Sequence, residues 1–313
     1  MAASECEGIP VAVISGPTAV GKSKLAVELA VRLGAEIISA DSMQIYKGLD
    51  IGTAKITMEE RRGIPHHMID IIRPDVVFSV KDYVEGARRI IDKNAKNKKP
   101  SIICGGTGLY ISSLIKGINF YGVYNDDERR KLIESEYDPD GGAALFSELE
   151  KADRAYAGRI HVNDRKRVVR AIEMLRANST PSAERQRSMM KPFRLNPFNI
   201  ILLPCERAVL YDRINARTDK MLENGLVEEA RYVYENRDSF LTASQAIGYK
   251  ELFPFFEAER GLPECIEQLK RSSRRYAKRQ ITWFSKLSDG IFMDFAELDI
   301  EMLAAKVKNH LKI

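Results

Sequence analysis

The segment from residue 16 to residue 23 has the pattern of a phosphate-binding loop. Its eight residues fit G-x-x-x-x-G-K-[ST] and are Gly16, Pro17, Thr18, Ala19, Val20, Gly21, Lys22 and Ser23. Glycine lets the backbone curl so that its N–H groups point inward, and the start of the following helix favours an anion. Lys22 adds a positive charge, and the Ser23 hydroxyl is a candidate ligand for Mg²⁺. The pattern predicts bound phosphate groups without identifying the ligand, and a chance glycine-rich turn is the alternative.

The position of the nearest acidic residue argues against ordinary ATP hydrolysis. An ATPase or kinase usually carries an aspartate at the end of a second apolar strand, where it helps to hold the metal. Here the apolar run 101–104 ends in Gly105-Gly106-Thr107, and the acid, Asp41, instead follows the run 36–40. This departure makes ATP hydrolysis less attractive without excluding it.

An alternation of apolar runs and helix-like segments must position this loop. We expect strands at 11–14, 36–40 and 100–104, and helices at 22–33 and 83–94. In the first of these helices, one face carries Leu25, Ala26, Leu29 and Leu33. Such alternation indicates parallel βαβ units, whose ligands bind at the carboxyl ends of the strands.

The pattern changes between residues 120 and 198. Charged, helix-like segments occupy 126–137, 142–153 and 164–177, and a polar stretch at 178–191 is expected to be a loop. The alternation returns with a strand at 199–203, a helix at 207–224 and a strand at 290–295. We therefore predict an α/β fold with a P-loop NTPase-like core, in which helices flank a parallel sheet. This core comprises residues 1–119 and 199–313, and a helical insertion domain at 120–198 interrupts it.

Composition excludes several classes of protein. The chain is 44% hydrophobic and 30% charged, and no apolar run approaches the roughly 18–20 residues of a membrane-spanning helix. The acidic first eight residues do not resemble a signal peptide. The four cysteines, Cys6, Cys104, Cys205 and Cys265, are far apart, so we expect no disulfide framework and no zinc site. These features fit a cytoplasmic protein that does not bind membranes.

The distribution of positive charge suggests a polyanionic partner. The net charge is +5, with six basic residues between 270 and 279 and four between 165 and 170. Clusters of this kind are typical of surfaces that bind a phosphate backbone. A solvated helix face is the alternative explanation.

Several further motifs, taken with the phosphate loop, carry a resemblance to a known family. They are D-S-M-Q-I-Y at 41–46, D-I-G-T-A-K at 50–55, P-H-H at 65–67, G-G-T-G-L-Y at 105–110, H-V-N-D at 161–164, K-R-V-V-R-A-I-E at 166–173, A-I-G-Y-K at 246–250 and K-R-Q-I-T-W-F at 278–284. Together they resemble the tRNA dimethylallyltransferase (tRNA isopentenyltransferase) family over residues 11–285. The isolated cysteines cannot form the C-terminal zinc finger found in many eukaryotic members, so the chain is similar to the bacterial type.

The resemblance implies a reaction and its partners. A dimethylallyl group would pass from dimethylallyl diphosphate to the exocyclic 6-amino group of the adenine that lies just 3′ of the anticodon. The family also implies a dependence on Mg²⁺ and a tRNA anticodon stem-loop that enters a channel through the core. No obligate protein partner is evident, and we expect a monomer.

The resemblance assigns roles on the donor side. Asp41 matches the catalytic aspartate and would take a proton from the attacking amine as a general base. An N-cap or a ligand in a metal's outer shell is the alternative for Asp41. Thr107 matches a position that contacts the diphosphate or the nucleotide, although a helix-capping threonine fits equally well. Arg213 and Arg217 share a helix face, and Arg217 would clamp the pyrophosphate unless that face is simply solvated.

The same resemblance assigns the tRNA-facing residues. These are Asp41, Ser42, Met43, Gln44, Thr107, Arg129, Lys166, Arg167, Val168, Val169, Arg170, Gln245, Ala246, Ile247, Gly248, Tyr249, Lys250, Lys278, Arg279, Gln280, Ile281, Thr282, Trp283, Phe284 and Ser285. An aromatic pair at a helix end, such as Trp283-Phe284, is more often core than stacking platform. His66 and His67 would point to opposite sides of a strand, so we expect a structural or substrate-proximal role and no metal binding.

Three alternative functions are weighed against this one. A small-molecule kinase has the same loop but needs ATP. An adenylate isopentenyltransferase, which prenylates free AMP, ADP or ATP, leaves the insertion and the basic C-terminal helix without a purpose. A non-catalytic RNA-binding module explains neither the phosphate loop nor Asp41.

Overall fold

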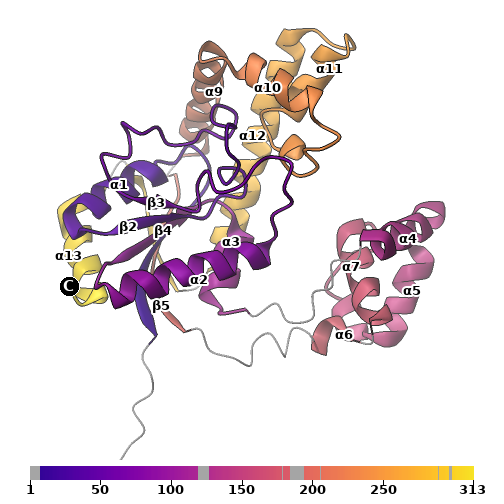
Figure 1. Cartoon of the computed structure of the whole chain (residues 1–313), viewed down its shortest axis with the longest axis horizontal. Helices are drawn as coiled ribbons and strands as arrows, with labels where there is room; N and C mark the ends of the chain where they lie inside the picture. The colour runs from indigo at the N-terminus through magenta and orange to yellow at the C-terminus, as the bar shows by residue number, and fades with distance from the viewer. Residues whose placement is uncertain are drawn as a thin grey trace, which may run out of the picture. The chain divides into compact units, whose positions relative to one another are not determined.

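The chain forms two compact units (Figure 1). The computed structural model describes residues 8–118, 127–177, 179–183, 194–204, 206–287, 289–295 and 298–313. One unit comprises Met1–Lys116 with Arg194–Ile313, and the other comprises Gly117–Phe193. The smaller unit therefore begins at residue 117 and ends at 193, against the expected limits of 120 and 198.

A six-stranded parallel sheet forms the centre of the larger unit, counted over the residues that the structure describes. Its strands lie in the order β3-β2-β4-β1-β5-β6, and all neighbours pair in parallel. The strands are β1 (Ile9–Ser15), β2 (Glu36–Ser39), β3 (His66–His67), β4 (Ser101–Gly105), β5 (Leu195–Leu202) and β6 (Gly290–Met293). The predicted parallel α/β core is confirmed.

Strand β5 begins earlier than the sequence indicates. The expected strand was 199–203, whereas β5 spans Leu195–Leu202 and includes Pro197, which has no N–H group to donate to a neighbouring strand. In the structure Pro197 lies in β5 opposite Val11 of β1, whereas pairing with β6 starts only at Asn199. Among the described residues, Pro197 therefore precedes the part of β5 that pairs with β6, and its missing N–H removes no hydrogen bond from that pairing.

Helices cover both faces of the sheet. Helices α1 (Lys22–Leu33) and α13 (Ile300–Leu311) pack with one face, and their apolar residues join those of β1, β4 and β5 in one cluster. Helices α2 (Val80–Lys96) and α3 (Gly108–Ile115) contact each other and β4. Helix α1 has the predicted bounds, and the predicted apolar face of that helix is buried. Figure 1 shows the sheet between these helices.

A second core within the larger unit extends beyond the sheet. It is built on α9 (Arg207–Glu223), α10 (Leu226–Glu235), the 3₁₀ turns at Ala243–Gln245 and Lys250–Leu252, α11 (Phe253–Phe256) and α12 (Leu262–Phe284). The chain after β2 joins this core through Ile45, Tyr46 and Leu49, which are buried against Leu226 and Leu252. Residues before and after the insertion therefore share one apolar cluster.

The smaller unit is helical. Its helices are α4 (Asp127–Tyr137), a 3₁₀ turn (Asp138–Asp140), α5 (Ala143–Ala152), α6 (Arg154–Ala157) and α7 (Arg165–Arg176). They enclose an apolar core that includes Ile133, Leu149 and Ile172. The three expected helices lie within a residue of α4, α5 and α7 at each end, and the expected loop 178–191 falls largely outside the described residues. Over the described residues, no helix is both long and apolar enough to cross a membrane.

Candidate active site

The phosphate loop joins β1 to α1 in a backbone conformation that requires two of its glycines. Gly16 has a φ of +145° and Gly21 a φ of +101°, both in the region that side chains disfavour. A Cβ on Gly16 would lie 2.3 Å from the carbonyl oxygen of Leu202. Ala19 also adopts a positive φ of 62°, which is uncommon for a residue with a side chain. The predicted strand–loop–helix context of the motif is present.

Lys22 lies at the start of α1 with its ammonium group desolvated. Its Nζ atom donates to the carbonyl oxygen of Pro17 at 2.7 Å, within the loop itself. The pKa of Lys22 is lowered to about 8, chiefly by burial and to a smaller extent by Arg217, although Cys104 and Asp41 partly offset these effects. Lys22 is thus a cation that the surrounding protein only partly stabilises, so an arriving anion gains from pairing with it.

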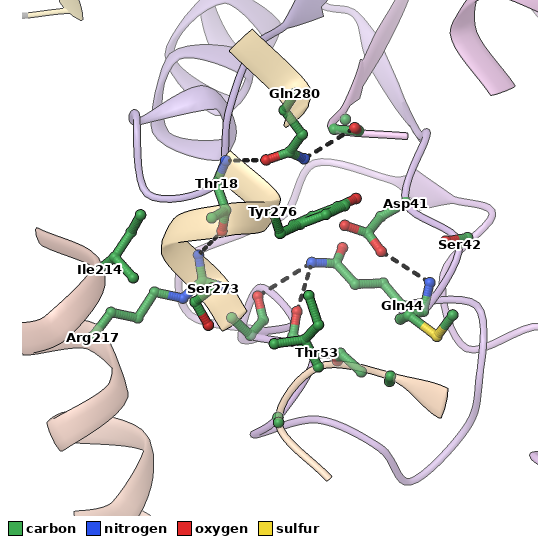
Figure 2. A pocket seen from close by; sticks show the side chains of 18 of the residues that line it. Thr18, Asp41, Ser42, Gln44, Thr53, Ile214, Arg217, Ser273, Tyr276 and Gln280 are labelled. Carbon is green, nitrogen blue, oxygen red and sulfur yellow. Dashed lines mark hydrogen bonds between the residues drawn. The ribbon is translucent and has the colours of Figure 1, made fainter. Parts of the chain in front are cut away.

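A cavity of about 340 Å³ opens beside this loop (Figure 2). Thr18, Lys22 and Ser23 line it from the loop, and Asp41 to Gln44 line it from the chain after β2. Its remaining walls come from the turn after β4, from α9 and α12, and from two loops at 52–54 and 245–250. A volume of this size lies within the range of small-molecule sites, roughly 300–1,000 Å³.

Asp41 and Thr107 lie at the carboxyl ends of adjacent strands. The Asp41 Oδ1 atom accepts a hydrogen bond from the amide of Met43 at 2.9 Å, which fixes the carboxylate at the cavity wall. The Thr107 Oγ1 atom accepts from the amide of Ser42 at 3.1 Å. Although Thr107 precedes α3, its side chain makes no capping hydrogen bond. Thr107 therefore supports the Asp41 segment, and the capping alternative does not hold.

The two arginines of α9 differ. The Arg217 guanidinium donates to Thr18 Oγ1 at 3.0 Å, and Arg217 lines the cavity together with Ile214, Thr218 and Met221. Burial lowers the pKa of Arg217, although Asp41 partly offsets this effect. Arg213 is exposed and does not line the cavity. The structure brings Arg217 to the phosphate loop and leaves Arg213 outside the pocket.

One face of α12 forms a wall of the cavity, of which the sequence reasoning named only Gln280, as a tRNA-facing residue. Leu269, Ser273, Tyr276 and Gln280 all line the cavity, at spacings of four, three and four residues. The pKa of Tyr276 is raised to about 12, chiefly by burial and also by the charge of Asp41, although hydrogen bonds with Thr107 and Gln280 partly offset these effects. The helical spacing was a usable signal, but a serine and a tyrosine near a basic cluster do not stand out.

Gln44 is oriented by a neighbouring loop. Its Nε2 atom donates to the carbonyl oxygens of Thr53 and Ala54, at 3.3 and 3.2 Å. Glu229 of α10 holds the start of this loop, because its carboxylate accepts hydrogen bonds from the amides of residues 50–52. Ser42 and Met43 also line the cavity. The predicted segment 41–44 therefore reaches one site as a unit.

The loop 245–250 meets that loop almost backbone to backbone. A Cβ on Gly248, whose φ is +117°, would lie 3.2 Å from the carbonyl oxygen of Gly52. A Cβ on Gly52 would lie 2.4 Å from the ring of Tyr249. Tyr249 is buried and its hydroxyl donates to Glu229, whereas Gln245, Ala246, Ile247, Gly248 and Lys250 line the cavity. Tyr249 thus supports the loop from behind.

The last turns of α12 are divided between surface and core. Lys278, Arg279, Thr282 and Ser285 are exposed, whereas Ile281 is partly buried. Trp283 is 42% exposed and donates to Ser112 Oγ at 3.2 Å, and Phe284 is fully buried. The core interpretation therefore holds for Phe284, and Trp283 keeps an accessible ring face.

The predicted residues of the helical unit fall into three groups. Lys166 and Arg167 are exposed on α7. Val168 and Val169 are buried in the core of that unit. Arg170 pairs with Glu173 at 2.7 Å, and Arg129 donates to the carbonyl oxygen of Arg176 at 2.6 Å. The side chains of Val168 and Val169 stabilise the helical unit and are not accessible to a ligand.

The histidine pair of β3 belongs to the scaffold. His67 Nε2 lies 2.7 Å from Glu36 Oε2, and His66 Nδ1 lies 2.8 Å from the Ile64 carbonyl oxygen. Neither lines the cavity. Within the described part of the chain, no group of three or more His, Cys, Asp and Glu side chains could hold a metal ion.

Comparisons with known proteins show which family this chain resembles. Residues 44–287 match the sequence profile described as IPP transferase. The tRNA dimethylallyltransferase of Bacillus subtilis is 41% identical over 303 residues, which is 96% of each chain. That of Acetivibrio thermocellus is 47% identical over 92% of this chain and 93% of the relative.

Solved structures show the same fold. The tRNA isopentenylpyrophosphate transferase of Bacillus halodurans is similar over 97% of each chain, with a TM-score of 0.72 and 40% identity. A eukaryotic dimethylallyltransferase, described as acting on tRNA, is similar over 91% of this chain and 73% of its own, with a TM-score of 0.78 and 29% identity. With a phosphate loop, an aspartate and an arginine around one cavity, and with relatives matched over nearly its whole length, the chain belongs to the tRNA dimethylallyltransferase family.

Proposed function

We propose that this protein transfers a dimethylallyl group from dimethylallyl diphosphate to the exocyclic 6-amino group of the adenine next to the anticodon, on its 3′ side, in tRNA. The observation that carries the proposal is the convergence of Lys22, Arg217 and Asp41 on one cavity. Two cations suit a departing diphosphate, and a carboxylate suits the attacking amine. The names and near-complete coverage of the relatives support the same substrates.

The donor end of the cavity suits the ionisation of an allylic diphosphate. Negative charge grows on the leaving group, so preorganised cations and loop amides lower the barrier. Lys22 and Arg217 occupy desolvated positions beside the loop, where electrostatic interactions are stronger than in water. The Ser23 hydroxyl and the Asp41 carboxylate are oxygen donors of the kind that Mg²⁺ prefers, and both line the cavity. Such a metal ion would neutralise charge on the diphosphate.

The acceptor end requires a base beside the adenine. The 6-amino group is a weak nucleophile because its lone pair is delocalised into the purine. Met43 fixes Oδ1 of Asp41, so the second carboxylate oxygen is suited to take the proton as the carbon–nitrogen bond forms. The adenine must leave the anticodon stack to reach this point.

Exposed basic residues suit the tRNA itself. Lys166 and Arg167 in the helical unit and Lys278 in α12 are exposed and available to phosphates. We also propose that the protein works as a monomer. A tRNA substrate also implies that the protein works in the cytoplasm.

Mass spectrometry of tRNA nucleosides tests the proposal. The protein is incubated with unmodified tRNA, Mg²⁺ and dimethylallyl diphosphate, and the anticodon-loop adenosine is examined for the added five-carbon group. Parallel reactions contain AMP in place of tRNA, or ATP in place of the prenyl donor. Prenylated AMP with unmodified tRNA, or phosphate transfer from ATP, would overturn the proposal in favour of the corresponding alternative.

A further inference from the structure

Gln280 is a buried link between three parts of the site. The residue lies on α12 and is 5% exposed. Its Oε1 atom accepts a hydrogen bond from the amide of Thr18 at 2.8 Å, and its Nε2 atom donates to the carbonyl oxygen of Gly106 at 3.0 Å. Figure 2 shows the side chain reaching from α12 to both partners. One amide thus joins the phosphate loop to the turn after β4.

Both backbone partners of Gln280 are connected to residues of the proposed catalytic arrangement, and its side chain also hydrogen-bonds with Tyr276 at the cavity wall. The side-chain oxygen of Thr18 accepts a hydrogen bond from Arg217, and the backbone amide of Thr18 donates one to Gln280. Gly106 immediately precedes Thr107, which supports the segment of Asp41. The contact with Gly106 is close, because a Cβ at that position would lie 2.3 Å from Nε2 of Gln280. The geometry therefore leaves Gln280 little freedom to turn towards a ligand.

We propose that Gln280 positions the phosphate loop for the donor diphosphate and does not bind tRNA. The inference rests on the proposed function and replaces the tRNA-facing role that the resemblance implied for this residue. Gln280 fixes the Thr18 peptide, and through it the loop amides that follow. Lys278, two residues earlier, is exposed and does not line the cavity, whereas Arg279 is exposed and does line it, so the RNA-facing and loop-facing roles divide within one turn of α12.

Loss of this amide should weaken donor binding selectively. Methionine has a similar length but offers neither donor nor acceptor of comparable strength, so Gln280→Met would leave the Thr18 amide and the Gly106 carbonyl without their partner. The loop would then be free to adopt other conformations. Because a net hydrogen bond contributes a modest amount to such an equilibrium, we expect the affinity for diphosphate to fall about five- to tenfold.

The test compares Gln280→Met with a matched change on the same helix. Gln268 donates to Ser272 Oγ and does not line the cavity, so Gln268→Met makes the same chemical change about three turns away. Four quantities are measured for each protein: the Kd for inorganic diphosphate with Mg²⁺, the KM for dimethylallyl diphosphate, the Kd for tRNA and the melting temperature. Of the three binding constants, only the Kd for diphosphate and the KM for dimethylallyl diphosphate should change in Gln280→Met, and none should change in Gln268→Met. The melting temperature shows whether each variant is folded at the assay temperature.

A second variant keeps the inference testable if Gln280→Met fails to fold. Gln280→Glu retains the acceptor for the Thr18 amide but loses the donor to Gly106 and adds a negative charge beside the loop. We expect weaker diphosphate binding with an unchanged Kd for tRNA. Weakened tRNA binding with unchanged diphosphate binding, or no change in either, would overturn the inference. A wild-type protein that binds diphosphate yet prenylates no tRNA would instead overturn the proposed function alone.

Discussion

Lys22 and Arg217 of the larger unit lie desolvated beside one cavity, whereas Lys166 and Arg167 of the helical unit are exposed on α7. Burial lowers the pKa of both cavity cations, because water no longer stabilises their charge. A desolvated cation in a cavity interacts strongly with an anionic ligand, but only with a group that occupies that cavity. An exposed cation interacts weakly, is screened by salt and tolerates a mobile partner. The cavity cations therefore suit the binding of a leaving group in a fixed position, whereas the exposed cations of α7 suit the binding of a long polyanion.

The largest expected effect concerns Asp41, the proposed general base at the cavity wall. Asp41→Asn keeps the shape and the acceptor for Met43 but removes the base, so prenyl transfer should fall by roughly 10²–10⁴. Single-turnover rates with saturating tRNA and dimethylallyl diphosphate measure this directly. Turnover within a few-fold of wild type, with normal substrate binding, would show that Asp41 is not the base.

The next effect separates two arginines on one helix. Arg217→Gln should raise the KM for dimethylallyl diphosphate about 10- to 100-fold, because a desolvated charge at Thr18 is lost. Arg213→Gln is the matched control, and its exposed side chain should change the KM by less than about fivefold. Equal increases in the KM of the two variants, measured by steady-state kinetics, would show that Arg217 contributes no more to donor binding than the exposed Arg213 does.

The pKa of Lys22 predicts how donor affinity depends on pH. Below about pH 8 the ammonium group is charged in both the free and the bound protein, so affinity should be constant. Above that value binding must first restore a proton, and affinity for dimethylallyl diphosphate should fall by up to about tenfold per pH unit. Lys22→Met should bind weakly without this dependence and so controls for titration of the ligand. A wild-type profile parallel to that of Lys22→Met would refute the assignment.

The smallest expected effects lie in the helical unit. Lys166→Ala and Arg167→Ala should each weaken tRNA binding only a few-fold and should each reduce the slope of log K against log salt by about one. The rate at saturating tRNA should be unchanged. Lys308→Ala, on the exposed face of α13 in the larger unit, is the control. An unaltered salt slope in the α7 variants would mean that α7 does not contact the phosphates.

Local patterns predicted the parts of the site that lie close together in the sequence. The phosphate loop and α1 follow from eight residues and one helical period, and both are present as expected. The family resemblance singled out Asp41 and Thr107, and the structure places them at the carboxyl ends of adjacent parallel strands, where ligands bind in such sheets. These residues lie within a few positions of a strand end in the sequence, so locating the strand also locates the residues.

The far wall of the cavity was not predictable in the same way. Tyr276 and Gln280 reach the loop across more than 250 residues of sequence, because α12 packs against α9 and the chain after β2. A glutamine within a basic motif reads equally well as an RNA contact or as an internal link. Only its burial and its two hydrogen bonds distinguish the two roles. Similarly, Val168 and Val169 share a motif with exposed cations, but helical geometry turns them inward.

The contact between the turns at Gly52 and Gly248 limits how the protein can change over evolution. The Gly248 main chain lies against the Gly52 main chain, and the buried ring of Tyr249 lies against Gly52, so there is little room for a side chain at either glycine. A chimera that takes residues 50–54 from one parent and 245–250 from another would combine two turns whose backbones need not pack against each other as closely. The two turns are nearly two hundred positions apart, yet they should be inherited as a pair.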